Sequence, residues 1–307
     1  MHAFSKIIGN ENLIRAMQTS VSHNRVGHAY IIDGSAGSGK RLLSLAFAKA
    51  ILCGRAIPCD ACASCKTLES GNHPDIIFVR PTKKSLGVDD IREQIVGICH
   101  IKPFSSAFRI FIIENAETMT IPAQNALLKT LEDGPKHAIF FLLSKNSGVF
   151  LPTVISRCVT YKTQPIAQNV VEEHLAIKGF SRETARLGAS HGAGSVGRAM
   201  AIAADDNFLQ LRDDITQIAD EMDSADIPTI FASAKAMEAH KDRIGEALDI
   251  MALHFRKDVL ACDDDEIAAA QAIKKIRIIE GTRQKLNQNC NFLLAMEVML
   301  LKMAGTS

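Results

Sequence analysis

The segment Gly34-Ser-Ala-Gly-Ser-Gly-Lys40 is the feature that most constrains the fold of this chain. It has the pattern G-x-x-x-x-G-K, follows the apolar run Tyr30–Ile32 and precedes the amphipathic stretch Arg41–Leu52. A strand, a glycine-rich turn and a helix in that order let backbone N–H groups converge on phosphate oxygens, and the lysine neutralises their charge. The sequence therefore predicts a phosphate-binding loop. The alternative is an ordinary glycine-rich turn with a surface lysine.

Two segments of the sequence depart from what a hydrolysing loop needs. Arg41 stands where Ser or Thr would offer a hydroxyl to Mg²⁺. The run Ile110–Ile113 ends in Glu114 and Asn115 instead of an Asp-Glu pair; Glu114 can hold a metal, but Asn115 cannot act as a base toward water. We expect a loop that binds ATP or ADP without efficient turnover, the alternative being a variant ATPase that tolerates both changes. The nucleotide-binding residues predicted here are Gly34, Ser35, Ala36, Gly37, Ser38, Gly39, Lys40, Arg41 and Glu114.

Short apolar runs alternate with amphipathic stretches through the first half of the chain. Buried strands are predicted at Tyr30–Ile32, Ile76–Val79, Ile110–Ile113 and Ile139–Leu143, and Val159–Tyr161 is a fifth candidate strand. Helices are predicted between them at Arg41–Leu52, Asp89–Ile98 and Pro122–Glu132. Such alternation predicts a five-stranded parallel sheet with helices on both faces.

After about Pro165 only helical patterns remain. Three short helices are predicted at Gln168–Ile177, Arg182–Ser190 and Ser195–Ala203. Five more are predicted at Phe208–Met222, Ile227–Ala239, Arg243–Ala261, Ile267–Asn287 and Asn291–Ala304. The predicted organisation is an α/β domain over residues 1–164, a small helical domain over 165–206 and a helical bundle over 207–307.

Four of the eight cysteines lie within thirteen residues, at Cys53, Cys59, Cys62 and Cys65. Cys-x2-Cys turns present pairs of thiolates, and four of them suit tetrahedral Zn²⁺. A structural zinc module is therefore predicted, with a redox pair or an iron–sulfur cluster as alternatives. The remaining cysteines are scattered, at Cys99, Cys158, Cys262 and Cys290.

Charge and hydropathy narrow the classes of partner. The net charge is +1, from 35 basic and 34 acidic residues, which argues against a protein that coats nucleic acid by bulk charge. No apolar run reaches the ~18 residues of a membrane span, and Met1–Asn10 lacks the pattern of a signal peptide. We expect a cytoplasmic protein with no membrane partner.

These motifs together resemble the clamp-loader subunits of bacterial DNA polymerase III, which are AAA+ proteins, and most of all their delta-prime type. The resemblance rests on Phe4–Glu11, Arg25–Tyr30, the cysteine cluster followed by His73–Asp75, Asn125–Asp133 and Ser156–Cys158. It runs along nearly the whole chain. It implies an AAA+ P-loop domain with a zinc module inserted at 53–65, then a helical lid and a C-terminal helical collar that serves oligomerisation.

The resemblance also implies roles for three polar residues. Arg157 would act as an arginine finger, projecting toward ATP on a neighbouring subunit. Asn146 and Arg198 would lie where the family carries its two sensors of bound phosphate. The alternatives are a local pair between Arg157 and a carboxylate, and a solvated Arg198.

The implied function is that of a clamp-loader subunit without polymerase activity and with little or no ATPase activity of its own. Its partners would be gamma/tau-type and delta subunits and, through the assembled complex, the sliding clamp and primed DNA. The first alternative is the ATP-hydrolysing gamma/tau-type motor subunit. Two others are a P-loop enzyme acting on a small substrate, such as a nucleotide kinase, and a free-standing zinc-ribbon nucleic-acid binder.

Overall fold

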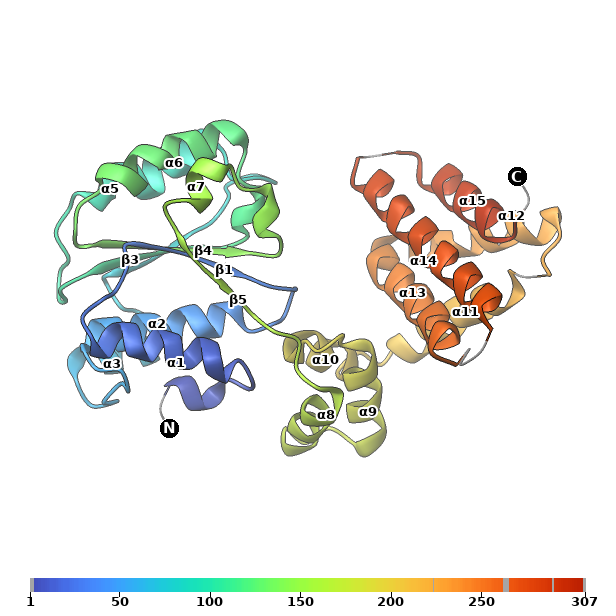
Figure 1. Ribbon diagram of the computed structural model, residues 1–307, viewed down its shortest axis with the longest axis horizontal. Helices are drawn as coiled ribbons and strands as arrows, with labels where there is room; N and C mark the ends of the chain where they lie inside the picture. Colours follow the sequence, from blue (N-terminus) through green and yellow to red (C-terminus); the bar gives the residue numbers. More distant parts are fainter. Residues whose placement is uncertain (1–2, 223, 262–264, 289, 306–307) are drawn as a thin grey trace. The chain divides into compact units, whose positions relative to one another are not determined.

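The computed structural model describes residues 3–222, 224–261, 265–288 and 290–305 (Figure 1). The chain divides into two compact units, Met1–Ala201 and Ile202–Ser307. Cys262 lies outside the described residues. The finer division at residues 164 and 206 stays a prediction.

A five-stranded sheet forms the centre of the first unit, with the strand order β2-β3-β4-β1-β5. Every pair of neighbouring strands is parallel, as predicted. Four of these strands consist of short apolar runs, which is why the three inner strands can be buried on both faces. The strands are β1 (Ala29–Asp33), β2 (Ile76–Val79), β3 (Arg109–Ile113), β4 (Ala138–Ser144) and β5 (Val159–Lys162).

Helices cover both faces of this sheet (Figure 1). One face packs against α1 (Glu11–Ser22) and α2 (Lys40–Cys53) through a core that includes Met17, Phe47 and Phe141. The other face packs against a core that includes Leu127 and Phe140. The elements on that side are α4 (Val88–Ile91), the π-helical segment η2 (Arg92–Val96), α5 (Gly97–Cys99), α6 (Ile121–Asp133) and α7 (Pro152–Ile155).

Shorter elements complete the first unit. The helix α3 (Ala63–Glu69) lies within and after the cysteine cluster. Three 3₁₀ turns are η1 (Ala3–Lys6), η3 (Ala116–Thr118) and η4 (Ser147–Val149). The last three helices are α8 (Gln168–Ile177), α9 (Arg182–His191) and α10 (Val196–Ala203), of which α10 extends two residues into the second unit. We call the part of the predicted lid that lies in the first unit, residues 165–201, the lid. The Ser181 hydroxyl accepts a hydrogen bond from the N–H of Thr184 and so caps α9.

Helices are the only regular secondary structure among the described residues of the second unit. It contains α11 (Phe208–Glu221), α12 (Ile227–Ala236), the 3₁₀ segment η5 (Met237–Arg243), α13 (Ile244–Ala261), α14 (Glu266–Asn287) and α15 (Phe292–Met303). These ranges agree with the predicted helices, with one difference. The helix predicted over Ile227–Ala239 changes to 3₁₀ geometry at Met237, and His240 has non-helical dihedral angles there. Among the described residues, no helix combines the length and the apolar character that crossing a membrane requires.

Candidate functional site

Backbone geometry makes the loop between β1 and α2 a cradle. Gly37 and Gly39 have φ angles of +73° and +84°, which L side chains rarely adopt. Gly34 is restricted in another way, because a Cβ there would lie 1.8 Å from the Thr163 hydroxyl oxygen. The three glycines of the motif therefore each meet a physical requirement of this turn.

Lys40 opens α2 and folds back over the loop. Its Nζ donates hydrogen bonds to the carbonyl oxygens of Gly34, at 2.6 Å, and Ser35, at 2.7 Å. Burial lowers the pKa of Lys40 from its ordinary value, and the nearby Glu117 carboxylate opposes that shift. The ammonium group of Lys40 is therefore hydrogen-bonded to carbonyl groups of the loop itself.

Arg41 and Arg80 share one carboxylate, and we call these two arginines with Glu114 the arginine–glutamate triad. Arg41 Nε lies 3.1 Å from Glu114 Oε1, and Arg80 Nε lies 2.8 Å from Glu114 Oε2. Both guanidinium groups also lie over the Phe78 ring, 5.0 Å and 5.6 Å from its centre. Glu114 is the group that the sequence left available for a metal, and both of its oxygens are engaged by cations. The donor set therefore does not fit Mg²⁺, which needs oxygen ligands.

A cleft of about 350 Å³ lies beside the loop. Six of the predicted nucleotide-binding residues line it: Ala36, Gly37, Gly39, Lys40, Arg41 and Glu114. Gly34, Ser35 and Ser38 belong to the same loop but do not line the cleft. Asn146 does not line it either, because its side chain caps η4 by accepting a hydrogen bond from the N–H of Gly148, at 2.9 Å. Lys145, the preceding residue, lines the cleft instead.

The lid touches the loop directly. The N–H of Gly197 donates to the carbonyl oxygen of Gly37, at 3.0 Å, and the Ser195 hydroxyl donates to that of Ala36, at 2.8 Å. The start of α10 therefore lies against the outer turn of the loop. Arg198 follows directly, and its backbone nitrogen would lie 2.6 Å from a Cβ at Gly37. The structure places its backbone at the loop, while its side chain is not among the cleft residues.

Arg157 makes contacts within its own chain. Its Nη1 donates to the Thr153 carbonyl oxygen, at 2.8 Å, and its Nη2 pairs with the Glu132 carboxylate. The Arg157 side chain is 33% exposed and that of Glu132 is 41% exposed. The local pair that the sequence left as an alternative is thus present in the single chain. Exposed pairs of this kind contribute only about 0–1 kcal/mol, so a stronger anion could displace Glu132.

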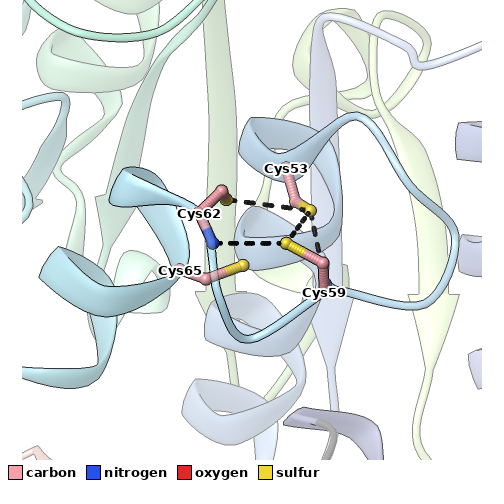
Figure 2. Close-up of side chains that lie close together, drawn as sticks. All are labelled: Cys53, Cys59, Cys62 and Cys65. Carbon is pink, nitrogen blue, oxygen red and sulfur yellow. Dashed lines mark hydrogen bonds between the residues drawn. The ribbon is translucent and has the colours of Figure 1, made fainter.

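The four clustered cysteines form a second candidate site at the end of α2 (Figure 2). Their sulfur atoms all lie within 4.8 Å of one another, and Cys53 Sγ lies 3.6 Å from Cys59 Sγ and 4.0 Å from Cys62 Sγ. Four thiolates around tetrahedral zinc lie about 3.8 Å apart, given zinc–sulfur bonds of about 2.3 Å. The cluster thus fits a metal ion such as Zn²⁺, with Cys53, Cys59, Cys62 and Cys65 as ligands. Bound there, it would tie the end of α2 to the start of α3.

Local contacts support the thiolate form of one of these cysteines and fix the position of the module. Hydrogen bonds from the N–H groups of Ala61 and Cys62 lower the pKa of Cys59 to about 6. The buried ammonium of Lys49, on α2, lies 2.6 Å from Oδ1 of Asp60, which is in the first Cys-x2-Cys turn. Burial and the neighbouring thiols raise the pKa of Cys65 to about 12, so the four sulfurs are unequal in the absence of a cation.

Sequence reasoning missed Arg80, the third member of the triad. The signal was present, because Arg80 and Glu114 each follow a strand directly. Val79 and Ile113 pair in the parallel register of β2 and β3, which places the next residues side by side. Glu117 and Lys145 were also missed, and both line the cleft.

A glycine-rich loop after β1, a parallel sheet with helices on both faces and a helical lid define a P-loop α/β protein with the features of the AAA+ class. A profile of the family described as "DNA polymerase III, delta subunit" matches residues 9–167, more than half of the chain. The chain belongs to that family. The resemblance to bacterial clamp-loader subunits is therefore confirmed.

Individual relatives include two proteins of Bacillus subtilis. DNA polymerase III subunit delta' is 33% identical over 207 residues, which are 65% of this chain and 61% of that protein. DNA polymerase III subunit tau is 28% identical over 261 residues, which are 81% of this chain and 45% of that protein. The chain thus spans less than two thirds of either relative. Among solved structures, a DNA polymerase III gamma subunit-related protein of Thermotoga maritima is similar over 96% of this chain and 98% of its own, with 18% identity and a TM-score of 0.46.

Proposed function

We propose that this chain is a delta-prime-type subunit of a clamp loader, and that it supports ATP turnover on a neighbouring subunit while turning over little ATP itself. Its relatives are named as delta' and tau/gamma subunits of DNA polymerase III, which supports gamma/tau-type and delta subunits as partners. The assembled ring would open the sliding clamp and place it on primed DNA.

The arginine–glutamate triad is the observation that carries the proposal. A hydrolysing P-loop needs a hydroxyl and a carboxylate on Mg²⁺, so that the metal can bridge the β- and γ-phosphates. Here Arg41 replaces the hydroxyl and Glu114 is held by two guanidinium groups. A divalent cation at this position would have to displace Arg41 from Glu114 and would still lack the hydroxyl. The backbone N–H groups of the loop and Lys40 can bind a phosphate. The loop lacks the free oxygen ligands that would hold the metal.

Arg157 is the residue that would act on the neighbour. A fixed guanidinium near the γ-phosphate offsets the charge that develops during transfer. In the single chain Arg157 pairs with Glu132 on the outside of the fold, and that pair is partly exposed. Exchange of the Glu132 carboxylate for a phosphate would therefore cost little. Asn146 and Arg198 would sense phosphate only after rearrangement, because neither side chain is among the residues that line the cleft.

The zinc module and the helical second unit have structural roles in this proposal. Zinc on the four cysteines would hold residues 53–65 against α2 and supply no chemistry to the loop. The helices of residues 207–307 would form the collar that joins the subunits of the ring.

The deciding experiment is steady-state ATP hydrolysis by a ring reconstituted with this chain, compared with the chain alone. We expect negligible turnover by the chain alone and a loss of about 10³-fold at the adjacent site in the Arg157→Ala ring, the low end of arginine-finger effects. The matched control is Glu132→Gln, which removes the local partner of Arg157 and should leave ring turnover intact. Equal turnover in the wild-type and Arg157→Ala rings would contradict the proposal.

A gamma/tau-type motor is the second candidate, favoured by the similarity to the tau and gamma subunits and by the preserved glycines and lysine of the loop. The same experiment separates the two. Robust Mg²⁺-dependent hydrolysis by the isolated chain, abolished by Lys40→Ala, would identify a motor subunit.

A further inference from the structure

A basic groove runs between α14 and α15 in the second unit. It has a volume of about 270 Å³. Four of its eight lining residues are cationic, and none carries a carboxylate. The lining residues are Lys274, Arg277, Ile278, Gly281, Thr282, Lys285, Val298 and Lys302.

The four cations of this groove differ from other basic residues of the same unit. Arg283, on the same helix, pairs with Asp249, and Lys275 lies 4.7 Å from the centre of the Phe255 ring. By contrast, Lys274, Arg277, Lys285 and Lys302 are all exposed, and within the described ranges no carboxylate forms an ion pair with them. Four unneutralised cations along one groove repel one another, which an anionic ligand would relieve.

A ligand in the groove can approach the backbone of α14 closely. A Cβ at Gly281 would have no heavy atom within 4 Å, so a ligand can come near the α14 backbone there. The Thr282 hydroxyl is already used, because it donates to the carbonyl oxygen of Ile278. Recognition in this groove would therefore rest on charge and not on a set of directed hydrogen bonds.

We propose that this groove binds the phosphodiester backbone of nucleic acid without reading its sequence. Lys274 and Lys285 are eleven residues apart on one helix, a distance of about 16 Å. One strand of B-form DNA carries a phosphate every ~3.4 Å along the axis. The stretch of α14 from Lys274 to Lys285 therefore spans about five phosphates. The proposal goes beyond the role of Arg157, since it concerns a different unit and a different ligand.

An acidic protein segment is the competing occupant, and the composition of the groove argues against it. The centres of protein interfaces are depleted in lysine and enriched in aromatic residues. This groove has three lysines and no aromatic side chain, and its apolar part consists of Ile278 and Val298. Non-specific phosphate binding needs only the cations.

The test measures binding of the full chain to a labelled oligothymidylate, and to a duplex of the same length, between about 50 and 200 mM salt. The groove variant is Lys274→Gln with Arg277→Gln. The matched control is Arg256→Gln with Lys257→Gln, which removes one exposed arginine and one exposed lysine from α13. Glutamine is a good helix former, so both variants should stay folded, and circular dichroism checks this.

We expect the groove variant alone to lower the slope of log K against log salt, by about 1.4 for the single strand and about 1.8 for the duplex. Each form whose slope falls by its own full expected value is a form that the groove accepts. Equal slopes in the wild type and the groove variant, or equal losses in the groove variant and the control, would overturn the proposal. Binding of poly-L-glutamate that depends on Lys274 and Arg277, without such binding of either oligonucleotide, would assign the groove to an acidic protein partner instead.

Discussion

Arg41 Nε lies 3.1 Å from Glu114 Oε1, so the residue that replaces the metal-binding hydroxyl pairs with the carboxylate that would complete the metal site. Arg41 and Glu114, which both depart from a hydrolysing loop, thus form one physical arrangement. An isolated Arg41 would leave a cation facing the bound phosphates, and an isolated Glu114 would leave an open metal ligand. The ion pair between Arg41 and Glu114 neutralises both of these charges, and Arg80 pairs with the second oxygen of Glu114.

Replacing Arg41 by threonine should restore a metal requirement. The change releases one oxygen of Glu114 and supplies the missing hydroxyl, so Mg²⁺ can bridge loop and phosphates. We expect Mg²⁺ to tighten ATP binding at least about tenfold in Arg41→Thr, or about 1.4 kcal/mol, and to have little effect in the wild type. Calorimetric titration with and without Mg²⁺ checks this. Arg80→Gln frees the other oxygen of Glu114 but adds no hydroxyl, so it should show a smaller gain. A wild-type chain that already prefers Mg²⁺-ATP would refute the assignment.

Replacing one clustered cysteine should remove the metal. In Cys62→Ser, a weakly coordinating hydroxyl replaces a thiolate in a set of four. We expect zinc, measured by elemental analysis, to fall from one atom per chain to near zero. The melting temperature should fall as well, by about 2 °C for each kcal/mol of stability that is lost. Cys290→Ser, at an exposed cysteine outside the cluster, is the control and should keep its zinc. Iron, or a visible iron–sulfur absorption band, in the purified protein would contradict a zinc site.

The ionisation of Asp75 should make the free energy of unfolding depend on pH in the acidic range. Burial alone would raise the pKa of this carboxylate, but hydrogen bonds from the N–H groups of Phe104 and Ser105 and from the Ser106 hydroxyl outweigh it and lower the pKa below 3.8. The stabilisation is therefore complete above pH 3.8 and disappears as pH falls through the depressed folded-state pKa. At pH 7 we expect Asp75→Asn to cost about 3 kcal/mol, because an amide accepts fewer of these bonds.

Chemical denaturation of the wild type and Asp75→Asn across pH measures this dependence. The difference between the two proteins should be constant above pH 3.8 and should shrink only in stronger acid. Asp133→Asn, at an exposed carboxylate at the end of α6, is the control and should change little. A difference that disappears between pH 5 and pH 7 would show that another group is responsible.

A methyl group at Gly197 should disturb the contact between lid and loop. A Cβ there would lie 2.8 Å from the carbonyl oxygen of Gly37 and 2.9 Å from its Cα, and both are backbone atoms that cannot rotate away. We expect Gly197→Ala to cost about 1–3 kcal/mol and to speed amide exchange in the loop. Gly245→Ala, where no heavy atom lies within 4 Å of the new Cβ, should instead be neutral or stabilising. Unchanged exchange at Ala36 and Gly37 in Gly197→Ala would show that the lid contact does not order the loop.

The sequence alone predicted the sheet because its strands carry a strong local signal. Short apolar runs such as Ile110–Ile113 can be satisfied only by burial on both faces, and glycines and caps separate them from helices. The helices of residues 165–305 were recognisable for a similar reason, since their apolar residues recur every three or four positions. The helix α1 carried the same signal, with buried Leu13, Met17 and Val21 four residues apart, although it was not predicted.

What could not be predicted depends on register and on contacts between distant segments. The predicted helix Asp89–Ile98 contains the π-helical segment η2, and apolar spacing does not distinguish that geometry from α. The positions of Arg41 and Glu114 were evident as departures, but their mutual pairing and the presence of Arg80 required the pairing of β2 with β3. The local pair of Arg157 with Glu132 required the packing of α7 near the end of α6. The trans role of Arg157 stays a prediction, because it concerns a second subunit.

The strand order leaves β2 and β5 at the two edges of the sheet, and each is only four residues long. Three of the four β5 residues are exposed, and the strand ends at Lys162. Short edge strands discourage another chain from adding a strand, and the lysine at the end of β5 strengthens that effect at its edge. Copies or relatives of this protein, crowded together in one assembly, should therefore not fuse their sheets into a continuous β-structure, and each sheet would stay a separate unit that resists aggregation.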